Sequence, residues 1–298
     1  MKIYFISIFL IILSSCSFDN KTGIWKNENI IDNKKDNKFE EFETLSAKTE
    51  SFNSLIKPKE DLKIILDPVK LNLKWSDEYY KRSNNPDNFS FKNSYELVFK
   101  SKKLSKYKTK NRTLYENKNV LFSDDKGNIT VYSTKNQKII FKYNFYKKKY
   151  KKIKKDLNFI VENNIVYIGD NLGYLYALDY IDKKLLWAQD YKVPFRSNIK
   201  ISGKKLLIVD TNNSLYLINK VNGEKLKIIP TEETLIKNEF INSLASNNDF
   251  IFLLNTFGSV YSVNNNGQVR WFSNLNQSMD INSSNLFSSK PLVLHQNK

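Results

Sequence analysis

The residue types that most often perform catalysis are almost absent from this chain of 298 residues. It contains one cysteine, Cys16, and one histidine, His295. A single cysteine allows no internal disulfide, and the two residues cannot supply the ligands of a Cys/His zinc site. His295 lies near the C-terminal end, where chains fray, so we expect no Ser–His or Cys–His pair in a folded core. Most enzyme classes that depend on histidine or cysteine are therefore excluded, and we expect no catalytic residue, metal or cofactor.

Cys16 stands at the end of a segment with the features of a secretory signal. Lys2 precedes a largely apolar run over residues 3–13, and two serines separate this run from the cysteine. The run is shorter than the roughly 20 apolar residues that a membrane-spanning helix needs. Leu13-Ser14-Ser15-Cys16 resembles the bacterial lipobox, in which the cysteine is lipidated and becomes the new N-terminus. We expect a lipoprotein signal peptide over residues 1–16 and lipidation of Cys16; the alternative is a signal cut by ordinary signal peptidase.

The residues after the cysteine suggest where the mature protein resides. An aspartate directly after a lipidated cysteine would favour the inner membrane, so Ser17 favours the outer membrane. Residues 17–60 are polar and mixed in charge, with no sustained periodicity. Such a composition is typical of a flexible tether. We therefore expect a protein anchored at the periplasmic face of the outer membrane by its lipid.

A repeated pattern of short strands covers the rest of the chain. Each unit contains three runs rich in Val, Ile, Leu, Tyr and Phe, separated by Asn, Asp, Gly and Lys turns, and a fourth run precedes each trio. Four strands in about 40–45 residues predict an all-β fold, a β-propeller of four-stranded blades. The alternative is a β-sandwich or β-solenoid. The turn positions are Gly127, Gly173, Ser214 and Gly258, and the closing positions are Phe141, Trp187, Ile228 and Trp271.

The large aromatic residues that close the units imply close packing between them. We expect Trp187 and Trp271 to be buried between neighbouring blades, because each has a large apolar area to remove from water. Residues 61–104 predict a degenerate blade, with strands over 62–66, 71–75 and 97–104. The propeller domain is therefore expected to span residues 61–298.

One unit closely matches a known repeat. Gly173-Tyr-Leu-Tyr-Ala-Leu-Asp179, followed by Leu185-Leu-Trp187, resembles the PQQ-like (pyrroloquinoline-quinone-type) propeller repeat. A lipobox followed by such a propeller resembles the BamB family of outer-membrane protein assembly lipoproteins. That resemblance implies an eight-bladed, non-catalytic scaffold that binds the periplasmic POTRA domains of BamA and other assembly-complex subunits, as a monomer within the complex. Residues 61–298 supply about five to five and a half blades, so we expect an incomplete, truncated propeller.

The same resemblance points to partner-binding residues. Family contacts lie in loops at one rim of the propeller, and one includes an apolar residue followed by arginine shortly after a blade-closing tryptophan. Phe195 and Arg196 stand in this place after Trp187, and an aromatic residue with an arginine is typical of interface hot spots. The alternative is that Phe195 packs between blades and Arg196 caps a turn. Glu232 and Glu233, in the long connection over residues 230–240, are a second pair of candidates.

The net charge of +17 comes almost entirely from lysine, because the chain has only four arginines. Readers of phosphate and bases usually rely on arginine, so we expect no nucleic-acid partner. Seven lysines gather over residues 147–155. They predict a solvated loop between blades, with a membrane-surface or partner patch as the alternative. Two other functions remain open: a periplasmic propeller for another ligand or envelope partner, and, least favoured, a fragment of a quinone-dependent oxidoreductase.

Overall fold

A computed structural model describes residues 66–91, 99–233, 240–275 and 290–295, the single residues 57, 93 and 97, and two short strands near the N-terminus. The chain divides into two units, residues 1–60 and 61–298. In the first unit, β1 (Ser17–Phe18) and β2 (Trp25–Lys26) pair antiparallel. The predicted signal peptide, with Cys16, and most of the predicted tether lie outside the described residues. Over the part that is described, no helix has the length and apolar character to cross a membrane.

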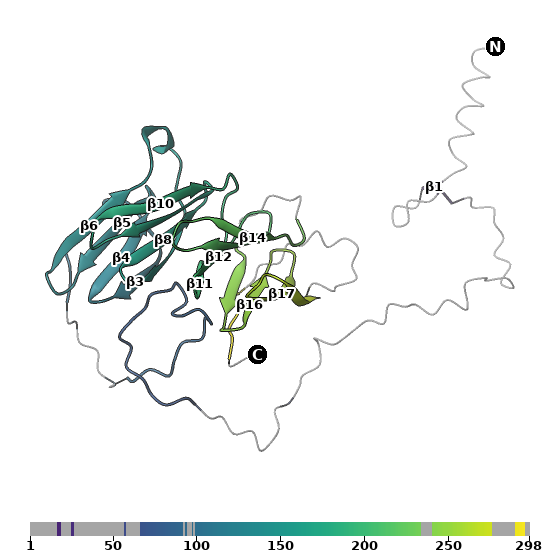
Figure 1. Ribbon diagram of the computed structural model, residues 1–298, viewed down its shortest axis with the longest axis horizontal. Helices are drawn as coiled ribbons and strands as arrows, with labels where there is room; N and C mark the ends of the chain where they lie inside the picture. The colour runs from purple at the N-terminus through teal and green to yellow at the C-terminus, as the bar shows by residue number, and fades with distance from the viewer. Residues whose placement is uncertain are drawn as a thin grey trace, which may run out of the picture. The chain divides into compact units, whose positions relative to one another are not determined.

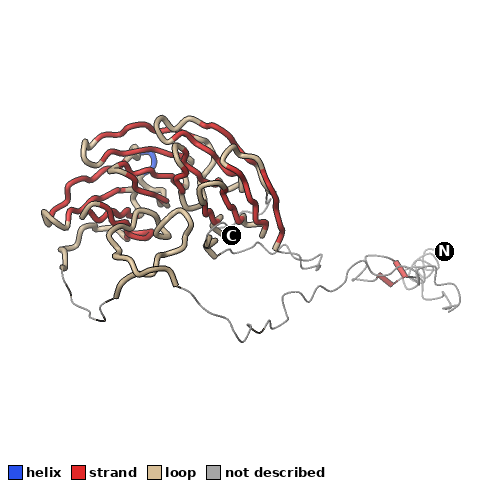
Figure 2. Tube along the Cα trace, turned by 60° about the horizontal axis from the view of Figure 1, so that its bottom comes forward, coloured by secondary structure: helices blue, strands red, loops and turns tan. Residues whose placement is uncertain are grey.

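Four antiparallel sheets make up most of the described part of the second unit, and in each the strands pair in chain order. They follow one another in an arc in Figure 1, and Figure 2 shows the same succession from below. The predicted four-stranded blades are thus confirmed. The first sheet holds β3 (Thr109–Glu116), β4 (Asn119–Asp124), β5 (Asn128–Ser133) and β6 (Lys138–Asn144); the second holds β7 (Leu157–Glu162), β8 (Ile165–Asp170), β9 (Tyr174–Asp179) and β10 (Lys184–Asp190); the third holds β11 (Lys200–Ser202), β12 (Lys205–Val209), β13 (Leu215–Asn219) and β14 (Lys225–Ile229); the fourth holds β15 (Ser243–Ser246), β16 (Phe250–Leu254), β17 (Ser259–Asn264) and β18 (Val269–Asn274).

The core lies between the sheets rather than within a single layer. The two middle strands of each sheet are largely buried on both faces, which explains why they are continuous apolar runs such as residues 206–209. One hydrophobic cluster joins the first and second sheets, another the second and third, and another the third and fourth. The fourth strand of each sheet, which we call the outermost strand, is mostly exposed; in β10, for example, only Trp187 is buried. Each sheet therefore depends on its neighbours for burial.

A β-bulge recurs at the same place in all four outermost strands. The register shifts once in β6, β10, β14 and β18 relative to the strand before it. The residue after the shift is the closing position, and it is Phe141, Trp187, Lys227 and Trp271 in turn. The prediction of Ile228 for the third sheet is therefore wrong by one residue, and the side chain of Ile228 is exposed.

Trp187 shows what the closing position does. Its indole nitrogen donates to the Lys220 carbonyl of the next sheet at 3.1 Å. A Cβ built on Gly223, whose φ is +73°, would lie 2.5 Å from the indole ring, so only glycine fits beneath it. Trp187 is accordingly 9% exposed, as predicted. Trp271 is 49% exposed, and the prediction that it is buried is wrong. Its indole is exposed because no further sheet in the described residues covers β18.

A side-chain-capped turn joins the second and third strands of every sheet. In the second sheet, Asp170 Oδ1 accepts hydrogen bonds from the backbone N–H groups of Leu172 and Tyr174, and Gly173 has positive φ as the repeat predicts. In the third sheet the positive-φ residue is Asn213, one position before the predicted Ser214. The capping residues of the four turns are Asp124, Asp170, Asp210 and Asn255.

The described part of the predicted degenerate blade forms no sheet. Residues 71–75 and the described residues of 97–104 contain no strand; residues 62–65, which make up most of the first predicted strand, lie outside the described residues. Residues 75–84 instead form a strap of isolated bridges and tight turns that runs along the first strands of the four sheets. The prediction failed because apolar alternation does not by itself provide a partner strand: Leu71 and Leu73 are more than 70% exposed, and only Trp75 of that run pairs with a sheet.

The strap contacts the sheets in chain order. Trp75 exchanges two backbone hydrogen bonds with Tyr115 of β3, and the Ser76 carbonyl accepts from the Val161 N–H of β7. Asp77 pairs with Lys200 of β11. Further along, the Arg82 carbonyl accepts from Ser246 of β15, and Asn84 donates to the Leu244 carbonyl at 2.8 Å. The strap therefore satisfies polar groups on strand edges that would otherwise remain unpaired.

Candidate partner-binding site

The connection after β10 carries the first predicted pair, Phe195 and Arg196, and it spans three sheets. The Phe195 N–H donates to the Asp170 carbonyl of the second sheet, and the Arg196 N–H donates to the Val209 carbonyl of the third. The Asn242 N–H, which leads into the fourth sheet, donates to the Arg196 carbonyl. These backbone bonds fix the position of Arg196 at the edge where the turns between second and third strands emerge.

The connection after β14 carries the second predicted pair, and it approaches the same turn. The side chain of Asn213 donates to the Glu232 carbonyl at 2.8 Å, and the Thr231 hydroxyl donates to the Asn213 carbonyl at 2.7 Å. Arg196 Nη2 donates to the carbonyl of Thr211, in the same turn, at 3.1 Å. The structure thus brings both predicted pairs to one turn. We call Arg196, the turn 210–214 and residues 231–233 the rim site.

Charges within the rim site influence one another. Burial lowers the pKa of the Arg196 guanidinium, and the neighbouring Asp210 opposes that effect. Burial raises the pKa of the Asp210 carboxyl, with the nearby charge of Glu233 acting in the same direction, while hydrogen bonds from Ser214 and Tyr216 oppose it. The rim site therefore joins a half-buried cation to a buried carboxyl and an exposed one.

Phe195 does not present its side chain to a partner. It is 3% exposed and packs edge-on against Tyr191 and Tyr216, at centroid separations of 5.3 and 5.7 Å. This position matches the alternative given above, in which Phe195 packs between blades. Arg196 is half-buried and remains the part of this pair that a partner can reach.

The two glutamates have different environments. Glu232 is half-buried, and its carboxylate accepts hydrogen bonds from Asn255 and Ser259, each at 2.9 Å. Burial alone would raise the pKa of Glu232, but the hydrogen bonds from Tyr261, Ser259 and Asn255 outweigh it and lower that pKa. Glu232 therefore anchors the connection to the fourth sheet, whereas the exposed Glu233 faces solvent.

The polar residues that build the rim site were not singled out from the sequence. Asn213 and Asn242 are fully buried, and each bridges two segments through its side-chain amide. The recurrence of Asp or Asn three residues before each positive-φ position was the available signal. Among the described residues, no group of three or more His, Cys, Asp or Glu side chains lies together in a way that could hold a metal ion.

The four sheets, their bulges and their capped turns define a β-propeller of PQQ-type blades. The family described as outer membrane protein assembly factor BamB matches residues 101–296, about two thirds of the chain, and the chain belongs to this family. The family resemblance seen in the sequence is therefore confirmed.

Similarity to individual proteins is distant. The crystal structure of BamB from Moraxella catarrhalis is similar at 14% identity with a TM-score of 0.47, over 55% of this chain and 48% of that one. BBS1N, solved in complex with ARL6DN, is similar at 14% identity with a TM-score of 0.40, over 53% of this chain and 50% of that one. The chain thus spans about half the length of either structure. No curated protein sequence matches it.

Proposed function

We propose that this protein is a non-catalytic scaffold of the machinery that assembles β-barrel proteins in the outer membrane. In this proposal, lipidation of Cys16 holds it at the periplasmic face of that membrane, and it acts as a monomer within the complex. It binds the POTRA domains of a BamA-like partner, and other subunits, through propeller loops. Membership of the assembly-factor family supports the proposal.

The observation that carries the proposal is the geometry of the rim site. Two connections, separated by a whole sheet in the chain, bring Arg196 and Glu233 to the same turn. Buried Asn213 and Asn242 hold that turn in place, so the two charged side chains are presented from a fixed backbone. Fixed, opposite charges favour binding to a surface that carries the complementary arrangement. We therefore assign the partner contact to Arg196 and Glu233, and a structural role to Phe195.

The test is a binding measurement between the full chain and the matching POTRA domains. Arg196→Ala is expected to weaken binding by about 2 kcal/mol, or about thirtyfold, because it removes a charge-assisted hydrogen-bond donor from an interface. The matched control is Arg270→Ala, which makes the same substitution at an exposed position on β18. Glu233→Gln should also weaken binding, by less, because an exposed charge at an interface rim contributes less.

Circular dichroism establishes whether each variant remains folded. Arg196→Ala should keep its β-sheet spectrum, whereas Phe195→Ala should lose thermal stability because Phe195 is buried. Unchanged POTRA binding by a folded Arg196→Ala variant would place the interface elsewhere on the propeller. Equal weakening by Arg196→Ala and Arg270→Ala would show that overall positive charge, and not the rim site, attracts the partner.

A further inference from the structure

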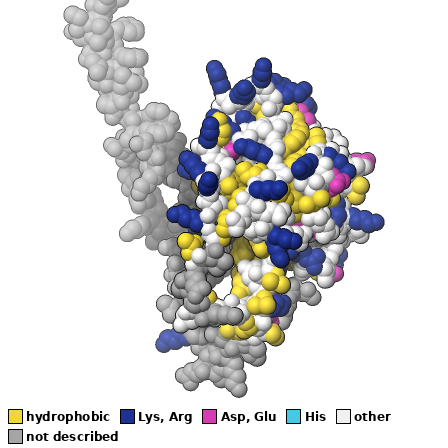
Figure 3. Space-filling model, turned by 90° about the vertical axis from the view of Figure 1, so that its left-hand side faces the viewer, with side chains coloured by type: hydrophobic (Ala, Val, Ile, Leu, Met, Phe, Trp, Pro, Cys, Tyr) yellow, Lys and Arg dark blue, Asp and Glu magenta, His cyan; other side chains and the backbone are white. Residues whose placement is uncertain are grey.

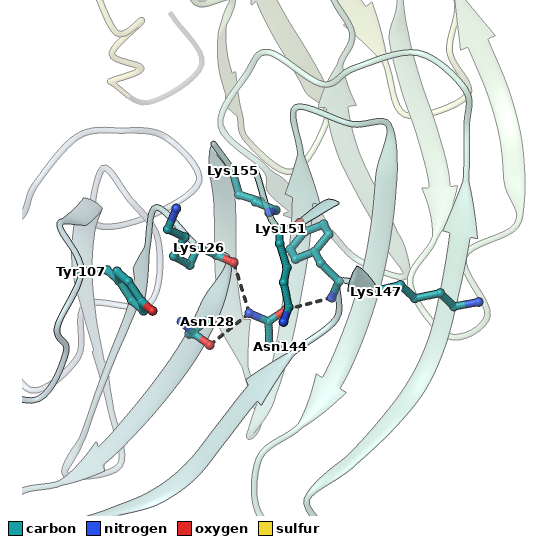
Figure 4. A pocket seen from close by; sticks show the side chains of 8 residues that line it. Tyr107, Lys126, Asn128, Asn144, Lys147, Lys151 and Lys155 are labelled. Atoms are coloured by element: carbon teal, nitrogen blue, oxygen red, sulfur yellow. Dashed lines mark hydrogen bonds between the residues drawn. The ribbon is translucent and has the colours of Figure 1, made fainter. Parts of the chain in front are cut away.

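The lysine run over residues 147–155 forms one wall of a cavity. After β6 the chain makes a single 3₁₀ turn, η1 (Lys148–Tyr150), and then returns to β7. The cavity between this loop and the β4–β5 turn has a volume of about 410 Å³. In Figure 4, Lys151 and Lys155 lie on one side, Lys126 and Tyr107 lie across from them, and Asn144 lies between. The side chain of Lys147 extends away from this group.

Lys155 differs from the rest of the run because it is buried. The other six lysines of the run are exposed, as the sequence predicts for a solvated loop, but Lys155 is 1% exposed. Its Nζ donates to the Tyr150 carbonyl and lies 5.2 Å from the centre of the Tyr146 ring. Burial lowers the pKa of Lys155 and the charge of Lys126 lowers it further, while the charge of Asp170 opposes both effects. Burying an amine without a paired carboxylate costs free energy.

The wall around Lys155 is closely packed. A Cβ built on Gly127, whose φ is +82°, would lie 2.4 Å from the ring of Tyr146 and 3.2 Å from the Lys155 side chain. Only glycine therefore allows the β4–β5 turn to approach this side chain so closely. The position of Lys155 beside Lys126 is thus fixed by packing.

Two nearby carboxylates, those of Asp124 and Asp170, are engaged in their own turns. Asp124 accepts hydrogen bonds from Ser105, Asn128 and the Lys126 N–H, and Asp170 accepts one from Tyr146 at 2.5 Å. No acidic side chain lines the cavity. Within the described residues, Lys126, Lys151 and Lys155 form no ion pair, and the amines of Lys126 and Lys151 donate to no protein acceptor. The cavity therefore gathers lysine side chains and has no acidic side chain in its lining.

The side of the molecule that carries β4–β6 is also positively charged. Figure 3 turns the side of the molecule that carries β4–β6 toward the viewer, and lysine and arginine side chains are spread across this face with few acidic ones among them. A cavity within a surface of one sign raises the local concentration of ions of the opposite sign. The cations of the cavity are thus reinforced by those around it.

We propose that this cavity binds a phosphate group. Lysine binds phosphate as a point charge, and three amines around one small concavity match the several oxygens of a phosphate. The volume is near the lower end of the range for small-molecule sites, which fits a small anion or a single headgroup. The phosphate belongs either to a soluble compound or to a membrane lipid headgroup, and the two arms of the following experiment distinguish these sources.

The first arm is calorimetric titration of the full chain with inorganic pyrophosphate at low ionic strength. Lys126→Gln with Lys151→Gln is the test pair, because both side chains are exposed and neither supports the fold through a hydrogen bond. The matched control is Lys148→Gln with Lys152→Gln, which removes the same charge from exposed lysines that do not line the cavity. The test pair should weaken binding by about a hundredfold, because it removes two charge-assisted hydrogen bonds and each contributes about tenfold or more. The control pair should change it less than about twofold.

The second arm measures sedimentation of residues 17–298 with vesicles of phosphatidylcholine, with and without phosphatidylglycerol. All proteins in this arm begin at Ser17, so they lack both the apolar run over residues 3–13 and the proposed lipid anchor, and vesicle binding reports on the cavity. A lipid headgroup is assigned if vesicle binding requires phosphatidylglycerol and is lost only in the test pair, while pyrophosphate does not bind. A soluble phosphate is assigned if pyrophosphate binds and its binding is lost only in the test pair, while the vesicles do not bind. Equal weakening by test and control pairs would overturn the proposal in favour of diffuse charge attraction. Absence of binding in both arms would also overturn it.

Discussion

Lys200→Met is expected to destabilise the protein more than any substitution of a surface lysine. The Lys200 side chain is fully buried, and its Nζ lies 2.7 Å from both carboxylate oxygens of Asp77. It also donates to the Lys81 carbonyl and to Asn84 Oδ1. Methionine has a similar length but no charge. The substitution therefore leaves the Asp77 carboxylate buried, with the Tyr79 N–H at 3.0 Å as its remaining described donor.

The expected loss follows from the burial of that carboxylate. Removing one partner of a buried ion pair costs about 3–5 kcal/mol, because the other charge is left uncompensated. Asp77→Asn leaves the Lys200 amine uncompensated in the same way and should cost a similar amount. Replacing both residues leaves no buried charge, so the double variant should lose less than the sum of the single losses, with a coupling of about 2 kcal/mol or more. Burial raises the pKa of Asp77 and lowers that of Lys200, and each charge opposes the shift of the other.

Equilibrium unfolding in urea, followed by circular dichroism, measures all three variants. Lys192→Met is the matched control, because its partner Asp190 lies at the surface and Lys192 is 80% exposed; its effect should stay within about 0.5 kcal/mol. If the two single losses add to the double loss within about 0.5 kcal/mol, the pair does not couple and the strap is not held through it. A loss from Lys200→Met as small as that from Lys192→Met would refute the burial argument directly.

Two further predictions concern inter-sheet packing and pH. Trp187→Ala should cost about 3–5 kcal/mol in urea unfolding, because the indole is buried on Gly223, whereas Trp271→Ala, half-exposed on β18, should cost distinctly less; equal losses would contradict the packing described here. Hydrogen bonds from Lys81 and Tyr80 lower the pKa of Asp87 from 3.8 to about 2. A carboxylate whose pKa is lowered on folding stabilises the protein above its unfolded pKa, and this contribution is lost as the pH falls from about 4 through 2. Asp87→Asn should therefore flatten the dependence of the melting temperature on pH in that window, and an unchanged slope would refute the role of this carboxylate.

Much of the fold could be predicted because its determinants are local. The strand–turn–strand pattern repeats every 40–45 residues or so, and each turn is specified by a capping Asp or Asn and a positive-φ residue a few positions later. The closing position was placed correctly at Phe141 and Trp187, where a large aromatic marks it. It was misplaced at Ile228, because Lys227 uses an aliphatic stem where the other sheets use an aromatic ring.

The candidate site was only partly accessible to such reasoning. The sequence could locate Phe195, Arg196, Glu232 and Glu233 on connections between blades, but a connection gives no information about which side chains face the core. Phe195 is buried because Tyr191 and Tyr216 close around it, and Tyr216 belongs to a different sheet. Arg196 and Glu233 both approach the turn 210–214 because one lies on the connection that precedes the third sheet and the other on the connection that follows it.

By itself, then, the sequence determined the blade repeat and the family, because hydrogen-bonded hairpins and their turns depend on residues close together in the chain. Only the tertiary structure decided the strap, the lysine cavity and the exposure of Trp271. Asp77 and Lys200 are separated by 123 residues, and neither residue type predicts a buried pair unless the strap is laid across β11. In the sequence, Lys155 is one of seven similar lysines; in the structure, it is the one against which the β4–β5 turn packs. Burial and electrostatic pairing depend on which distant segments meet, and that is a property of the packed sheets.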